Sequence, residues 1–299
     1  MRMNFACPAK INLTLEVLDR RDDGYHALRS VIVPLELADD LRVEPAAGFS
    51  FTCSDPTLEG EDNLVVKAAR ALDPLPRAAI ALHKVIPTQA GLGGGSSDAA
   101  ALLRAAMSGA FEHRYTRDWI GLARSLGSDV PFFLTDSGAL VEGTGERVTA
   151  VGALPAWHVL IVKPPASVST AAAYALLDRT SRPSRPRNAS VSLEAVSALQ
   201  RDDFETVERL LQNDFHDPIA ESTPPVARAI EALHAAGARN ALLAGSGSAV
   251  FTLARSAEEI AAIDSRLDLS PDYLRLRTAF AHGRSWRGGV ALREAQGTP

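Results

Sequence analysis

The stretch Gly91-Leu92-Gly93-Gly94-Gly95-Ser96-Ser97 runs directly into Asp98-Ala-Ala-Ala-Leu-Leu-Arg-Ala-Ala-Met107. The second part is rich in alanine and leucine, so it predicts a helix that begins where the glycines stop. The glycines let the backbone approach a ligand without Cβ atoms in the way. The free N–H groups at the helix start face the loop and favour an anion. The pattern indicates a phosphate-binding loop, and the alternative is a glycine-rich turn that only packs tightly.

This loop differs from the two commonest nucleotide-binding motifs. It lacks the Gly-Lys-Ser/Thr ending of a P-loop, and the chain before it runs from a predicted strand through Pro87 into a loop, unlike a dinucleotide-binding fingerprint, in which the glycines follow a strand directly. Asp98 falls in the first turn of the predicted helix, where its charge suits the helix dipole but repels a phosphate. We therefore expect its side chain to point away from the ligand.

Two charged residues elsewhere are candidates for catalysis. Lys10, one of only four lysines, lies in the alternating segment 9–18, which predicts a strand. It either places an ammonium beside a transferring phosphoryl group or simply extends to the surface. Asp129 lies between a predicted helix end and an apolar run, where it either accepts a proton from a hydroxyl or only stabilises a turn. A base, a cation and a phosphate loop are sufficient for phosphoryl transfer.

A second glycine segment, Gly245-Ser-Gly-Ser248, interrupts an apolar run in the second half of the chain. As a structural feature it would be a bulge or a tight turn. As a functional feature it would let the backbone approach a ligand held between two domains. The sequence alone favours neither.

Apolar patterning predicts strands and helices that mix without a regular alternation, which favours an α+β fold with two domains. Predicted strands cover 9–18, 28–37, 41–45, 78–85, 159–162, 241–243, 250–253 and 274–280, and predicted helices cover 63–72, 98–107, 116–126, 192–199, 203–213, 224–236 and 256–266. Leu154-Pro155 marks the expected boundary. The expected parts are an N-terminal domain over 1–154, a C-terminal domain over 155–286 and a mobile tail over 287–299.

The composition excludes several classes of function. The 31 basic and 36 acidic side chains give a net charge of −5, which disfavours a nucleic-acid partner. No uncharged apolar run approaches the roughly 18 residues of a membrane span, and no apolar signal segment precedes Lys10. We therefore expect a cytoplasmic protein without a membrane partner. Cys7 and Cys53 lack metal-ligand spacing and are expected to be small buried hydrophobes, the alternative being a disulfide.

Three separated motifs resemble those of the GHMP kinases, a family named for galactokinase, homoserine kinase, mevalonate kinase and phosphomevalonate kinase. They are Pro8-Ala9-Lys10-Ile11-Asn12-Leu13, the glycine loop and Ala244-Gly245-Ser246-Gly247-Ser248. Within the family, the resemblance is to members that phosphorylate 4-(cytidine 5'-diphospho)-2-C-methyl-D-erythritol (CDP-methylerythritol), and it is carried by Asp23-Gly24-Tyr25-His26, Gly127-Ser-Asp-Val-Pro-Phe-Phe133 and Asn213-Asp214. It covers nearly the whole chain.

The resemblance implies a two-domain α+β fold with the active site in the cleft between the domains. It implies ATP, with Mg²⁺, as phosphoryl donor to the 2-hydroxyl of CDP-methylerythritol, giving the 2-phosphate and ADP in the non-mevalonate (MEP) pathway of isoprenoid biosynthesis. It also implies that Asp129 is the catalytic base and that Lys10 is its partner.

The resemblance further implies the binding residues. The segment that would hold ATP consists of Pro87, Thr88, Gln89, Ala90, Gly91, Leu92, Gly93, Gly94, Gly95, Ser96 and Ser97. The residues that would contact the substrate are Asn12, Tyr25, His26, Thr170 and Tyr174, with His26 bonded to the cytosine edge and the two tyrosines stacked on the base. Without the resemblance, a position in the core or at the rim is the favoured interpretation of both tyrosines. The sequence identifies no metal ligand.

Two other functions fit parts of the pattern. One is a GHMP-type kinase that acts on a small alcohol without a nucleotide. The other is a nucleotide-binding regulatory module without catalysis, and the presence of both Lys10 and Asp129 argues against it. We expect a monomer or a weak homodimer that acts on a small molecule.

Overall fold

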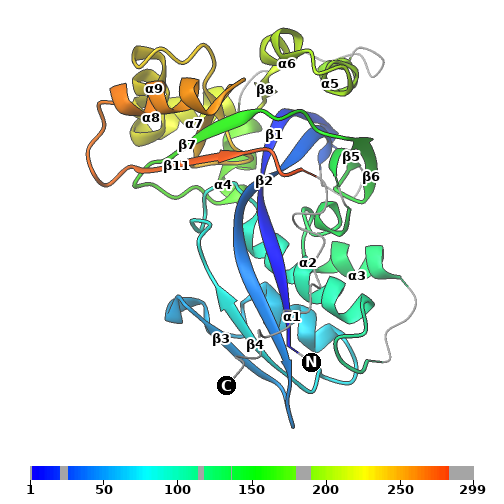
Figure 1. The fold of residues 1–299 in the computed structure, drawn as a ribbon. Helices are drawn as coiled ribbons and strands as arrows, with labels where there is room; N and C mark the ends of the chain where they lie inside the picture. Colours follow the sequence, from blue (N-terminus) through cyan, green and yellow to red (C-terminus); the bar gives the residue numbers. More distant parts are fainter. Residues whose placement is uncertain (1, 21–25, 114–117, 136, 180–189, 283–299) are drawn as a thin grey trace, which may run out of the picture.

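The larger of two sheets is built around two long strands. The computed structural model describes residues 2–20, 26–113, 118–135, 137–179 and 190–282. Strands β1 (Met3–Arg20) and β2 (His26–Pro45) pair antiparallel and run along much of the molecule (Figure 1). Within the described residues, five shorter strands complete the sheet: β3 (Ser50–Cys53), β4 (Ala78–His83), β5 (Gly138–Gly143), β6 (Arg147–Gly152) and β8 (Gln212–Asn213). The order is β3-β4-β2-β1-β8, and β5 pairs with β2 and β6.

The structure corrects the prediction of two strands over 28–37 and 41–45. Both belong to β2, which continues through Asp39-Asp40 without a turn. Two adjacent aspartates are typical of a turn, but the side chain of Asp39 is fully buried and bonded to Lys84. A buried partner therefore overrides the local preference.

Three helices belong to the part of the chain that forms the larger sheet: α1 (Leu64–Ala71), α2 (Gly94–Met107) and α3 (Trp119–Leu126). The short 3₁₀ segments η1 (Pro56–Leu58) and η2 (Phe132–Leu134) accompany them. One face of α2 packs in an apolar cluster with β1, β2 and β4. This cluster fixes where the glycine loop enters the helix.

Two predicted helix starts are wrong. Helix α2 begins at Gly94, inside the glycine run rather than after it, and the N–H of Ser97 donates to the carbonyl of Gly93 at 2.9 Å. The first glycines of the helix thus contribute their own N–H groups to the anion-binding end. Helix α3 begins at Trp119 with Asp118 as its cap, because the Asp118 carboxylate accepts from the N–H of Gly121. Thr116, the expected cap, lies outside the described residues.

The smaller sheet has the order β11-β7-β10-β9, from strands β7 (His158–Lys163), β9 (Leu242–Leu243), β10 (Val250–Ala254) and β11 (Leu274–Ala279). The helices of this half are α4 (Thr170–Leu177), α5 (Val191–Gln200), α6 (Phe204–Leu210), α7 (His216–Ser222), α8 (Pro224–Ala235) and α9 (Ala257–Arg266). The helix predicted over 203–213 ends at Leu210, because residues 212–213 pair with β1 as β8. Helices α4 and α7 were not predicted.

The predicted α+β class is confirmed, and the two halves are connected closely. The domain boundary that we propose at residues 154/155 lies between β6 and β7. Beyond it, β8 returns to the first sheet, and a bridge joins Leu35 to Phe280. The tail predicted over 287–299 lies outside the described residues. Among the helices that the structure describes, none has the length and apolar character needed to cross a bilayer.

Candidate active site

The two glycine segments of the sequence lie against each other. The N–H of Ala249 donates to the carbonyl of Ala90 at 3.1 Å, and the N–H of Ser248 donates to that of Gln89 at 3.4 Å. Gly91 has a φ of +75°, and a Cβ there would collide with the carbonyl oxygen of Ala244. Glycine is therefore required at 91 both by the backbone conformation and by the close contact with the second segment.

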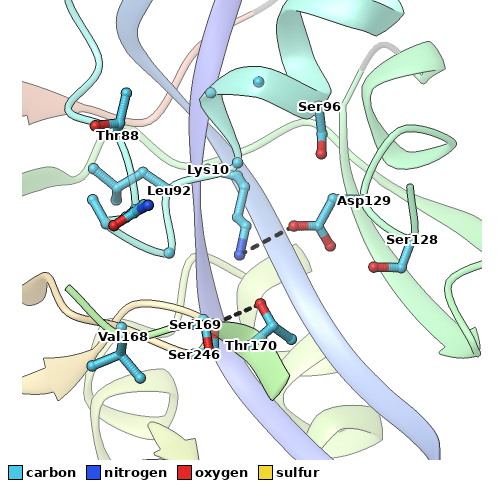
Figure 2. A pocket seen from close by; sticks show the side chains of 18 of the residues that line it. Lys10, Thr88, Leu92, Ser96, Ser128, Asp129, Val168, Ser169, Thr170 and Ser246 are labelled. Atoms are coloured by element: carbon cyan, nitrogen blue, oxygen red, sulfur yellow. Dashed lines mark hydrogen bonds and ion pairs between the residues drawn. The ribbon is translucent and has the colours of Figure 1, made fainter. Parts of the chain in front are cut away.

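Both segments line one cavity of about 1030 Å³, shown from close by in Figure 2. Every residue from Pro87 to Ser96 lines it, together with residues 245–247. Ser97 differs from its neighbours, because its side chain is fully buried beneath the helix start. Of the two adjacent serines, the hydroxyl of Ser96 is the one that faces the cavity (Figure 2).

Lys10 and Asp129 meet at the wall of this cavity. The Lys10 Nζ atom lies 3.6 Å from Asp129 Oδ2, although the residues come from β1 and from the turn after α3 (Figure 2). The lysine side chain is 4% exposed and the aspartate 35%, so the carboxylate is the accessible member of the pair. Because both residues line the cavity, a substrate oxygen bound there can approach both groups.

A chain of hydrogen bonds fixes the position of Lys10. Its Nζ donates to Asn12 Oδ1 at 2.7 Å, the Asn12 amide donates to Ser30 Oγ at 2.8 Å, and that hydroxyl donates to the Thr14 carbonyl at 2.6 Å. The Lys10 N–H also donates to the Leu92 carbonyl of the glycine loop at 2.9 Å. Asn12, expected to contact substrate, lines the cavity but also orients the lysine.

Of the residues expected to bind the substrate, Thr170 and Tyr174 lie at the end of the cavity formed by α4 and α7, whereas Asn12 lies beside Lys10 and His26 is not among the residues that line the cavity. Tyr174 and Thr170 line it, and the Thr170 hydroxyl lies 3.2 Å from that of Ser246. The His26 ring stacks on Tyr174 with centroids 5.5 Å apart and 13° between the planes. His26 Nε2 lies 3.2 Å from Asp178 Oδ1. Tyr25 lies outside the described residues.

Sequence reasoning missed a buried charge cluster beneath the glycine loop. Lys84 Nζ lies 2.5 Å from Asp39 Oδ2 and 2.7 Å from Asp98 Oδ2, and all three side chains are at most 10% exposed. Asp39 also accepts from the N–H groups of Val85 and Ile86. The cluster therefore ties β2 and the chain entering the loop to the helix that leaves it. The scarcity of lysine, with one placed three residues before Pro87, was the available signal.

Burial governs the ionisation of this cluster. Desolvation, reinforced by Asp39 and opposed by Lys84, raises the pKa of Asp98 to about 7. Desolvation alone would lower the pKa of Lys84, but the two carboxylates outweigh it and raise that pKa. Cys7 and Cys53 are buried free thiols, as predicted, and burial raises the pKa of Cys7 well above its ordinary value.

Comparisons with known proteins agree with this geometry. Residues 63–137 match the family described as GHMP kinases N terminal domain, and residues 195–268 match GHMP kinases C terminal. A 4-diphosphocytidyl-2-C-methyl-D-erythritol kinase of Deinococcus radiodurans is 41% identical over 87% of each chain, and one of Solidesulfovibrio magneticus is 42% identical over 83% of this chain and 87% of its own. The crystal structure of a 4-(cytidine 5'-diphospho)-2C-methyl-D-erythritol kinase superimposes with a TM-score of 0.76 at 34% identity, covering 93% of this chain and all of the other. The chain belongs to the GHMP kinase family.

Proposed function

We propose that this chain transfers the γ-phosphoryl group of ATP to the 2-hydroxyl of CDP-methylerythritol, producing the 2-phosphate and ADP. The observation that carries the proposal is the Lys10–Asp129 pair at the wall of a cavity lined by the glycine loop. The relatives named above, which are 4-diphosphocytidyl-2-C-methyl-D-erythritol kinases, match this chain over most of its length and support the proposal. The reaction would be a step of non-mevalonate isoprenoid synthesis.

The chemistry follows from the positions of the two charged groups. The carboxylate of Asp129 takes the proton of the substrate hydroxyl, and the resulting alkoxide oxygen forms a bond to the γ-phosphorus. The bond between the γ-phosphorus and the β,γ-bridging oxygen breaks, and ADP leaves with that electron pair. Lys10, held by Asn12, places a positive charge beside the oxygen that becomes negative.

ATP would occupy the side of the cavity formed by Pro87 to Ser96. There the helix start at Gly94 directs N–H groups and a partial positive charge toward the phosphates. Ser97 would contribute through its backbone, because its side chain is buried.

Mg²⁺ would arrive bound to the phosphates, since this ion is usually held by one or two protein oxygens together with substrate phosphates. Within the described residues, no cluster of three His, Cys, Asp or Glu side chains could hold a metal alone, which fits an ion delivered by the nucleotide. The Ser96 hydroxyl and the Asp129 carboxylate are among the protein oxygens that line this cavity (Figure 2). When bound, the ion neutralises phosphate charge.

The cytidine would occupy the end of the cavity near Tyr174. An aromatic ring offers a stacking surface, and the imidazole of His26 beside it offers a ring nitrogen for the base edge. Tyr25 is proposed to complete this site.

The decisive experiment is an ADP-release assay with ATP, Mg²⁺ and CDP-methylerythritol, with the product position assigned by phosphorus NMR. Free methylerythritol, which lacks the nucleotide, is the matched substrate control. We expect turnover of the nucleotide ester alone, and inhibition by CDP that is competitive with this substrate and not with ATP. Equal turnover of the free alcohol, or indifference to CDP, would instead favour a kinase for small alcohols. Absence of any ADP release would favour a non-catalytic nucleotide-binding module.

A further inference from the structure

Asn213 is a buried residue of the second half of the chain that lies beside the first strand. It forms the end of β8, where it pairs with Leu15 of β1, and it is 5% exposed. Its amide makes three hydrogen bonds: Nδ2 donates to the carbonyls of Leu243 and Gly245, both at 2.7 Å, and Oδ1 accepts from the N–H of Phe215 at 2.9 Å. Its partners fix the orientation of the amide, since two are acceptors and one is a donor.

The nitrogen side of Asn213 supports the reactive end of the cavity. One of the two carbonyls that accept from Asn213 Nδ2 belongs to Gly245, which begins the turn packed against the glycine loop. A Cβ on Gly245 would lie 2.9 Å from Lys10 Nζ and 2.8 Å from the Gly91 carbonyl oxygen. The position of this turn thus limits where the ammonium of Lys10 can lie.

The oxygen side of Asn213 supports the other end of the cavity. It holds the backbone of Phe215, whose ring packs edge-on against Tyr174 with centroids 5.0 Å apart. Tyr174 in turn stacks on His26. The rings of Tyr174 and Phe215 line the cavity and form its aromatic wall, whereas His26 supports Tyr174 from outside the lining residues.

We propose that Asn213 is a positioning residue. Its amide nitrogen holds the Gly245 turn against Lys10, and its amide oxygen holds the backbone of Phe215 and thereby the aromatic wall. The inference rests on the proposed function for the identity of the substrate. A buried amide with all its partners satisfied specifies one arrangement, and removal of a donor leaves buried carbonyls unpaired. Asn213 bonds to neither Lys10 nor Asp129. It acts on Lys10 through the Gly245 turn and on Tyr174 through Phe215.

The test compares three variants of the full-length chain. Asn213→Ala removes both links, whereas Asn213→Asp keeps the acceptor for Phe215 and removes the two donors. Asn240→Ala is the matched control, because Asn240 is also buried, donates to the Leu253 carbonyl, accepts from the Leu253 N–H and lies outside the residues lining the cavity. The measurements are kcat, the Kd for CDP and the Tm of each variant.

We expect Asn213→Ala to lower kcat about tenfold or more and to weaken CDP binding about threefold. Asn213→Asp should lower kcat similarly and leave the Kd for CDP within about twofold. Asn240→Ala should lower the Tm and leave both quantities within about twofold. Equal losses of kcat in Asn213→Ala and Asn240→Ala, or a wild-type kcat in Asn213→Asp, would overturn the proposal. If Asn213→Ala or Asn213→Asp does not fold, Asn213→Ser is measured in its place. The outcome expected of Asn213→Ser is the one given for Asn213→Ala.

A second measurement is independent of the substrate. In hydrogen exchange of the ligand-free chain, Asn213→Asp should accelerate exchange in residues 244–248 and spare the N–H of Phe215. Unchanged exchange in 244–248 would overturn the role of Asn213 even if the chain were inactive on CDP-methylerythritol. Inactivity of the wild-type chain together with the expected exchange pattern would contradict only the proposed function.

Discussion

Two lysine–carboxylate clusters adjoin the glycine loop, and they differ in how completely their charges are satisfied. Lys84 lies 2.5 and 2.7 Å from two carboxylates that are almost wholly buried. Lys10 lies 3.6 Å from a single carboxylate that is 35% exposed and faces the cavity. The tight cluster holds the two ends of the loop together, whereas the loose pair retains groups that a substrate can engage. The same residue types thus serve structure where they are saturated and chemistry where they are not.

The loose pair should give the largest effect on catalysis. Replacement of Lys10 by methionine removes the positive charge beside the reacting oxygen, and we expect kcat to fall about 100-fold or more. Steady-state ADP release measures kcat. Calorimetric titration with ATP serves as the control, and the variant should still bind ATP because the glycine loop is intact. Lys10→Arg should not restore activity, since a planar guanidinium on a longer side chain does not reproduce the contacts of the Lys10 ammonium with Asn12 and Asp129. Recovery of full activity in Lys10→Arg would contradict this assignment.

The tight cluster should instead give the largest effect on stability. Lys84→Met leaves two buried carboxylates without their cation, and we expect a loss of about 3–5 kcal/mol in the free energy of unfolding. Urea denaturation measures this loss. Lys67→Met is the matched control, because Lys67 pairs with the exposed Asp62 and should lose nothing measurable. An equal free energy of unfolding in Lys84→Met and Lys67→Met would show that the tight cluster does not stabilise the fold.

Asp98 should make the stability of the tight cluster depend on pH. Its pKa is about 7 in the folded chain against an ordinary value of 3.8, so the folded state binds the proton more strongly. The resulting stabilisation is present below pH 3.8 and is lost as the pH rises through 7. Between pH 5 and 8 the free energy of unfolding of the wild type should fall by roughly 2–3 kcal/mol relative to that of Asp98→Asn.

Denaturation of both proteins across this pH range tests the expectation, because contributions from other carboxylates cancel in the difference. The titratable groups that interact with Asp98 are Lys84, Asp39 and the thiols of Cys7 and Cys53, and all four are retained in Asp98→Asn. Parallel pH profiles of the two proteins would show that Asp98 does not titrate in this range.

The aromatic wall should show a smaller and different effect. His26→Ala removes the ring that stacks on Tyr174 of the wall and the nitrogen proposed for the cytosine edge, and we expect the KM for CDP-methylerythritol to rise about tenfold with little change in kcat. The KM for ATP should stay constant. An unchanged KM for CDP-methylerythritol would reject cytosine recognition by His26.

The sequence predicted the loose pair and missed the tight cluster for physical reasons. Lys10, Asp129 and the glycine loop belong to motifs whose residue types point to chemistry. Asp39 follows the local pattern of a turn, and the strand continues there because it pairs with β1 and β4 and because the Asp39 side chain is buried against Lys84. Asn213 was placed at the end of a helix, although pairing with β1 makes it a strand. These positions are determined by contacts between residues that lie more than 40 positions apart in the sequence. Local preferences do not encode such contacts.

Chemistry is expected at the loose pair and not at the tight cluster. Single-turnover rates at saturating ATP and CDP-methylerythritol, compared between Asp129→Asn and Asp98→Asn, test this expectation directly. We expect the rate of Asp129→Asn to fall about 100-fold or more and that of Asp98→Asn to stay within about threefold of wild type. An Asp129→Asn rate above a tenth of wild type, or a greater loss in Asp98→Asn, would contradict the account.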